Sequence, residues 1–90
     1  MIKYQFNTDP DGRRHFEKHG VSIEEIDEVF TEQKCFTKKR NDKSYVSYCK
    51  LRSGRYLEVL YRNISKNEYF IITAYDIENS GMIQFLDEQE

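Results

Sequence analysis

The residues best suited to chemistry are tyrosines and arginines spread between residues 40 and 75. Single-stranded nucleic acid is bound when its bases stack on aromatic rings and cationic groups follow its phosphates. The alternative is that tyrosine is simply a favourable strand residue whose hydroxyl suits a half-exposed sheet. Under the first interpretation, the sequence predicts an RNA-binding surface made of Arg40, Tyr45, Arg52, Tyr56 and Tyr75.

The charges are distributed unevenly, although the net charge is only -2. The segment 34–66 has ten basic and two acidic residues, whereas 17–32 has six acidic and one basic. The last fifteen residues have five acidic and no basic side chains. Clustered Lys and Arg are typical of surfaces that bind polyanions, and ordinary solvated surface is the alternative.

No metal or cofactor is expected. His15 and His19 are spaced i, i+4, which can bring two imidazoles together on a helix, but a metal site needs at least a third ligand. The sequence has no nucleophile motif, phosphate-binding loop or zinc signature. We interpret the two histidines as partly exposed side chains at a helix end.

Length and composition predict one domain, residues 1–90, with an acidic C-terminal tail at 77–90. No stretch resembles a signal peptide or approaches the roughly 20 apolar residues of a membrane span. Cys35 and Cys49 do not suggest a disulfide framework. We therefore expect a cytoplasmic protein with reduced thiols and no membrane partner.

The N-terminal part predicts a short strand and a first helix. Ile2 to Phe6 alternates apolar and polar residues, which is the period of a strand. A helix is expected from about Pro10 to His19, because proline is favoured at the first helical position. Gly20 should end it, since glycine tolerates the left-handed cap conformation.

The second helix has the clearest local signal. Ser22 and Glu25 have the spacing of a capping box, in which each side chain bonds the other residue's backbone amide. The helix should run to about Gln33. Its apolar positions fall at helical spacing on one face: Ile23, Ile26, Val29 and Phe30.

Residues 45–76 predict an antiparallel meander of three strands, preceded by an edge strand at 35–40. If Ser53 and Gly54 form a two-residue loop, Tyr48 lies opposite Val59. We expect the next hairpin to close at Arg62 and Tyr69. The last segment, 82–86, is expected to be a short helix or a docked tail.

This register divides the meander into two faces, which a slip of one residue would exchange. The expectation is an α+β fold with both helices packed on one face of about four antiparallel strands. The expected core face carries Val46, Tyr48, Leu57, Val59, Tyr61, Phe70, Ile72 and Ala74. The opposite face carries Tyr45, Ser47, Cys49, Tyr56, Glu58, Leu60, Arg62, Tyr69, Ile71, Thr73 and Tyr75.

One stretch resembles a known family. Lys18-His19-Gly20-Val21-Ser22-Ile23-Glu24-Glu25, followed by Glu28-Val29-Phe30, is similar to a motif of BrnT-like toxins in the RelE/ParE-type toxin superfamily. The resemblance covers roughly residues 6–77 and includes the Ser-Gly-Arg hairpin and an apolar last strand. Ile72-Thr73-Ala74-Tyr75 is closer to a related group of uncharacterised small domains.

The resemblance implies a RelE-like fold and metal-independent cleavage of RNA, with the 2′-hydroxyl attacking the adjacent phosphate. By the motif match, Lys18 and His19 are the candidate catalytic residues, with His19 as acid or base. Arg62 joins them as the cation that neutralises phosphate, together with Arg40. The implied partners are RNA and a protein antitoxin, and an oligomer is possible. The alternative is a non-catalytic α+β domain that binds a protein or nucleic acid.

Overall fold

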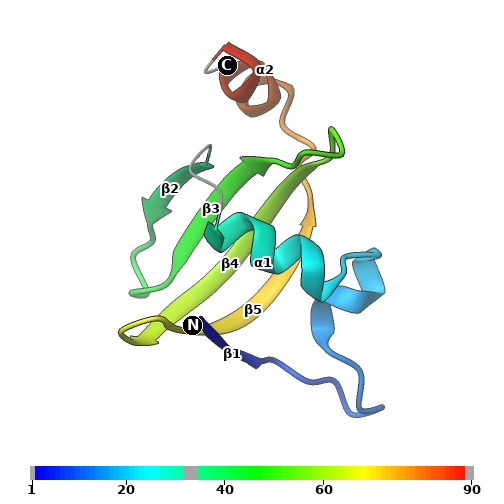
Figure 1. Cartoon of the computed structure of the whole chain (residues 1–90), viewed down its shortest axis with the longest axis vertical. Helices are drawn as coiled ribbons and strands as arrows, with labels where there is room; N and C mark the ends of the chain where they lie inside the picture. The colour runs from blue at the N-terminus through cyan, green and yellow to red at the C-terminus, as the bar shows by residue number, and fades with distance from the viewer. Residues whose placement is uncertain (1, 32–34, 89–90) are drawn as a thin grey trace.

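The computed structural model describes residues 2–31 and 35–88 and has an α+β architecture, as the sequence predicts (Figure 1). A five-stranded mixed sheet has the strand order β1-β5-β4-β3-β2. The elements are β1 (Lys3–Phe6), the 3₁₀ helix η1 (His15–His19), α1 (Ile23–Thr31), β2 (Cys35–Lys39), β3 (Tyr45–Lys50), β4 (Tyr56–Ser65), β5 (Glu68–Asp76) and α2 (Ser80–Glu88).

The expectation of about four antiparallel strands is wrong in one respect, because β1 adds a fifth strand that runs parallel to β5. The backbone amide of Lys3 donates to the carbonyl of Asn67 at 2.8 Å, and that of Asn7 donates to Ile71 at 3.0 Å. Tyr4 and Phe6 pack against the core from this strand, as their alternation predicts. Pairing between strands so distant in sequence leaves no local signal for its direction.

The first hairpin of the meander differs from its predicted register by one residue. Leu51 and Arg55 pair through a backbone hydrogen bond of 2.7 Å, so the loop has three residues and not two. Gly54 occupies the left-handed region at φ 95°, as a three-residue hairpin loop commonly requires. Tyr48 therefore lies opposite Glu58 and not Val59.

The second hairpin closes at Ser65 and Glu68, closer to its turn than the predicted pair of Arg62 and Tyr69. The pairing of β4 with β5 is irregular further from this turn. Leu60 pairs with Thr73, whereas the next residue, Tyr61, pairs with Ile71. One extra residue on β5 changes which side chains face the core. Ile71 and Ala74 are consequently both fully buried, although they are three residues apart.

With these registers, the side chains of β3 point to the opposite faces from those predicted, whereas the side chains of β4 point as predicted. Leu57, Val59 and Tyr61 are buried in the core as predicted. The strand β3 instead turns Cys49 inward and presents Tyr48 on the opposite face. The face under α1 is called the inner face below, and the opposite one the outer face. Tyr45, Ser47, Cys49, Tyr69 and Ile71, all expected on the outer face, lie on the inner one.

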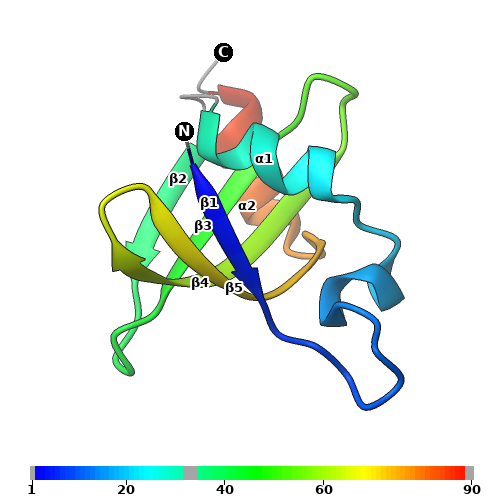
Figure 2. The ribbon, with the colours of Figure 1, turned by 60° about the horizontal axis from the view of Figure 1, so that its bottom comes forward.

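The two segments expected to be helices over one face, η1 and α1, both contribute side chains to the inner core, Phe16 from η1 among them. The helix α2 lies on the opposite face of the sheet (Figure 2). Ile26 and Val29 of α1 are buried in the inner core. From α2, Asp87 accepts a hydrogen bond from the Tyr56 hydroxyl and forms an ion pair with Lys50 at 3.3 Å. Both partners are on the outer face, so α2 covers one end of that face.

The segment before α1 is less helical than predicted. Residues 9–13 form a turn instead, with hydrogen bonds between the backbones of Asp9 and both Gly12 and Arg13. Helical structure is confined to η1, which ends at Gly20 with φ 72°, as predicted. Glycine at position 12, with φ 86°, explains why the helix does not start earlier.

The capping box at the start of α1 is confirmed. The Glu25 amide donates to the Ser22 hydroxyl at 3.2 Å, and the Ser22 amide donates to the Glu25 carboxylate at 3.0 Å. The helix is described as far as Thr31, and its predicted end at Gln33 lies outside the described residues. No helix in 2–31 or 35–88 has the length and apolar character needed to cross a bilayer.

The expectation of reduced thiols is contradicted, because Cys35 and Cys49 form a disulfide. The two residues are direct neighbours across β2 and β3, with a Cα–Cα distance of 4.4 Å. Their separation of fourteen residues gave no sign of this contact, which depends on the strand register.

Candidate functional site

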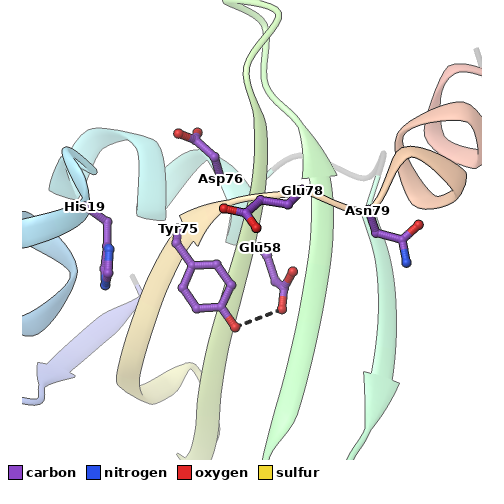
Figure 3. A pocket seen from close by; sticks show the side chains of 6 residues that line it. All are labelled: His19, Glu58, Tyr75, Asp76, Glu78 and Asn79. Atoms are coloured by element: carbon purple, nitrogen blue, oxygen red, sulfur yellow. Dashed lines mark hydrogen bonds between the residues drawn. The ribbon is translucent and has the colours of Figure 1, made fainter.

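The outer face of the sheet has a row of polar and aromatic side chains across its three central strands. Tyr48, Glu58 and Tyr75 are neighbours on β3, β4 and β5. The Tyr75 hydroxyl donates a hydrogen bond of 3.1 Å to Glu58 Oε2 (Figure 3). Burial, followed by the Glu58 charge and this hydrogen bond, raises the pKa of Tyr75. Tyr75 is therefore a protonated donor at neutral pH.

His19 lies against this row, although it comes from the end of η1. Its ring is 5.7 Å from the Tyr75 ring and meets it edge-on. Both side chains line a cleft of about 520 Å³, a size suited to a small ligand or a nucleotide. Figure 3 shows the residues around this cleft, which are His19, Glu58, Tyr75, Asp76, Glu78 and Asn79.

Arg55 fixes the position of the His19–Gly20 turn. Its guanidinium donates to the backbone carbonyl of Gly20 at 2.9 Å and to that of His19 at 3.3 Å. It also bonds the Glu25 carboxylate at 2.9 Å and Asp76 at 2.6 Å. A planar guanidinium has five N–H donors in a fixed fork and can hold several acceptors at once. Arg55 therefore connects η1, α1 and the end of β5.

Basic side chains surround a second hollow at the other end of the outer face, near the turn between β2 and β3. Arg62 reaches this turn and donates to the Asp42 carbonyl at 3.0 Å. Burial and Glu58 raise the pKa of Tyr48, and the charge of Arg40 acts in the opposite direction. Arg40 is thus close enough to influence the central row. The hollow is lined by Lys38, Lys39, Arg40, Asn41, Asp42, Val46 and Tyr48.

Four of the predicted site residues lie by the two hollows of the outer face: His19, Arg40, Arg62 and Tyr75. The first and last line the cleft, whereas the two arginines lie by the β2–β3 turn. Lys18, adjacent to His19 in sequence, forms an ion pair with Asp9 at 3.1 Å and does not line the cleft.

The other predicted residues are placed elsewhere. Tyr45 is on the inner face, where its ring stacks on Tyr61 at 5.6 Å. Tyr56 is on the outer face but at its α2 end. Arg52 lies by α1, and its backbone amide donates to Glu28 at 2.6 Å.

Sequence reasoning missed two members of the candidate site: Glu58, which lines the cleft, and Tyr48, which lies on the outer face. Glu58 is one of only two acidic residues in the basic segment 34–66, and that contrast is the signal that could have found it. Tyr48 was assigned to the core because a two-residue loop was assumed. The three-residue loop places it next to Glu58.

The spacing of His15 and His19 raises the question of a metal site. Residues 2–31 and 35–88 contain no group of three or more His, Cys, Asp and Glu side chains that could hold one. His15 is engaged by Asp9 instead, at 3.0 Å from its Nδ1. The hydrogen bond from His15, together with Lys18, lowers the pKa of Asp9.

Comparisons with known proteins add no family assignment. A scan against protein-family models found no match, and searches of curated proteins and of solved structures found none either. Functional interpretation therefore depends on the geometry and the motif. Chemically, the outer face combines a carboxylate that can accept a proton, hydroxyl and imidazole groups that can donate one, and nearby cations.

Proposed function

We propose that the protein is a metal-independent endoribonuclease, the toxin component of a toxin–antitoxin pair. The observation that carries this proposal is the pairing of Glu58 with Tyr75 beside His19, on the face that also carries Arg40 and Arg62. RNA cleavage without a metal needs a base, an acid and a cation. This face has candidates for all three.

In the proposed reaction, Glu58 accepts the proton of the RNA 2′-hydroxyl as its oxygen attacks the adjacent phosphate. The bond from phosphorus to the 5′-oxygen breaks, and that oxygen takes a proton from His19 in its imidazolium form. Tyr75 orients Glu58 through its hydrogen bond to the carboxylate. Arg40 and Arg62 offset the negative charge of the phosphorane. A 2′,3′-cyclic phosphate and a free 5′-hydroxyl result.

The biological setting follows from the BrnT resemblance and is part of the same proposal. The α+β architecture is compatible with the RelE-like fold that the resemblance implies. We propose a protein antitoxin as a partner and the cytoplasm as the location, since RNA is there. Cytoplasmic reductants would then act on the Cys35–Cys49 disulfide.

The test measures the rate at which the full chain, its site variants and a control variant cleave a purified single-stranded RNA. Glu58→Gln removes the base, and we expect a loss of about 10²- to 10⁴-fold in rate. His19→Ala should give a loss of similar size. Tyr75→Phe should lower the rate, whereas Tyr45→Phe on the inner face should leave it unchanged. The proposal fails if Glu58→Gln and His19→Ala cleave as fast as the parent protein.

One observation favours the alternative of a non-catalytic RNA-binding domain. The cleft around His19 is lined by three carboxylates, Glu58, Asp76 and Glu78, which disfavour a phosphate there. RNA would then be held only by the basic hollow at the β2–β3 turn. Salt-sensitive RNA binding without any cleavage by the parent protein would support this alternative.

A further inference from the structure

The free side of β2 has backbone groups available for pairing. β2 is the last strand in the sheet order, and within the described ranges no strand flanks its other side (Figure 1). The backbone amide of Arg40 donates to the Ser44 carbonyl at 2.7 Å, so Arg40 and Ser44 form a hydrogen-bonded pair of the antiparallel ladder. Hydrogen-bonded and non-hydrogen-bonded pairs alternate along such a ladder. By this alternation, Cys35, Thr37 and Lys39 direct their N–H and C=O groups away from β3. The short Cα distance between Cys35 and Cys49, 4.4 Å, is typical of such non-bonded pairs.

The side chains along this edge are basic. Lys38 and Lys39 are exposed, Arg40 follows directly, and β2 contains no acidic residue. A second copy of the chain pairing through the same edge would bring these charges together, which is unfavourable. An incoming strand with acidic side chains would neutralise them.

The other end of the edge is apolar. Phe36 of β2 and Phe85 of α2 are 37% and 38% exposed, and their ring centroids are 5.2 Å apart. They line a shallow hollow together with Asn79, Gly81 and Met82. An apolar side chain on the outer face of an added strand would pack against Phe36 and Phe85.

We propose that the β2 edge binds an extended acidic segment of a partner protein as a sixth, antiparallel strand. The side chains of β2 specify its pattern, because facing residues of paired strands interact. The partner needs acidic residues opposite Lys39 and Lys38, a hydroxyl residue opposite Thr37 and an aromatic residue opposite Phe36. In the partner's own direction this reads Glu-Glu-Thr-Phe. The proposal does not depend on RNA cleavage.

The test uses the full ¹⁵N-labelled chain and an acetylated, amidated peptide containing Glu-Glu-Thr-Phe. We expect shifted resonances and slowed hydrogen exchange at the backbone amides of Thr37 and Lys39. Two N-methylated peptides provide the decisive comparison. Methylation of the first Glu and the Thr blocks the amides that face β2 and should weaken binding at least about tenfold. Methylation of the second Glu and the Phe blocks only amides that face away and should leave binding unchanged.

Protein variants separate this edge from general electrostatic attraction. Lys38→Glu combined with Lys39→Glu should abolish binding, whereas Lys66→Glu on the β4–β5 turn, two strands away from β2, should preserve it. The proposal is overturned if no change occurs at Thr37 and Lys39, or if both methylated peptides bind equally well. Concentration-dependent dimerisation through β2, seen by sedimentation and lost in Lys39→Pro, would also overturn it in favour of a second copy.

Discussion

At the scale of single residues, Arg55 links the stability of the fold to the position of His19. Its guanidinium bonds the backbone of η1 and the carboxylates of Glu25 and Asp76. The Asp76 hydrogen bond, offset in part by burial and supplemented by Glu25, raises the pKa of Arg55. His19 therefore lies beside Tyr75 because Arg55, from the hairpin between β3 and β4, holds the backbone of the His19–Gly20 turn.

Replacing Arg55 tests this link. Arg55→Ala should lower the free energy of unfolding by about 2 kcal/mol, since charged hydrogen-bond acceptors lose their partner. It should also remove the ring-current shift that Tyr75 imposes on the His19 ring protons, measured by NMR on the folded variant. Arg13→Ala, in the exposed turn before η1, serves as the control. Unchanged His19 resonances in folded Arg55→Ala protein would contradict the link.

Glu25 gives a prediction for acid stability. Burial raises the pKa of Glu25, but the Ser22 amide and Arg55 together outweigh burial and lower it below the ordinary value of 4.5. A lowered pKa in the folded state stabilises the protein above pH 4.5, and this contribution is lost as the pH falls through the folded-state pKa. Denaturant unfolding between pH 7 and 2 should show this decline. Glu25→Gln should flatten it, and Glu24→Gln on the same helical turn should not.

At the scale of elements, the disulfide ties β2 to β3. Cys35 and Cys49 are separated by fourteen residues, and closing a loop of that size stabilises a protein by about 3 kcal/mol. A reductant should therefore lower the free energy of unfolding by about this amount. Chemical denaturation with and without dithiothreitol measures the effect, and a Cys35→Ser variant should not respond to it. Identical midpoints for the parent protein under both conditions would show that the bond contributes nothing.

At the scale of the whole molecule, the proposed RNA binding makes a prediction from the charge separation between the two ends of the outer face. Phosphates should follow Lys38, Arg40 and Arg62, and the carboxylate-lined cleft should receive a sugar and base. The affinity for single-stranded RNA should then fall with salt, with a log–log slope of about −0.7 for each neutralised phosphate. Arg62→Ala should reduce the slope by about one such unit, and Arg13→Ala should not. Fluorescence anisotropy between 50 and 300 mM salt, roughly, measures both slopes, and a flat dependence would count against RNA binding on this face.

The sequence by itself determined the local structure of the chain, because local signals depend on nearby residues. The Ser22–Glu25 capping box, the Gly20 stop and the three strands of the meander all lie where the residue pattern predicts them. Tyr75 lies on the last of these strands, and His19, chosen only for the motif resemblance, has its ring beside that of Tyr75. Periodicity and capping were sufficient for these features.

Only the tertiary structure decided which side chains share a face. A hairpin loop of three residues in place of two moved Tyr48 to the outer face, because successive side chains in a strand alternate between faces. The same shift placed Tyr45 on the inner face, away from the cleft. The parallel position of β1 and the Cys35–Cys49 contact join residues that are distant in sequence or depend on register. Residue pattern thus gave the elements, and strand registration placed Glu58 between Tyr48 and Tyr75.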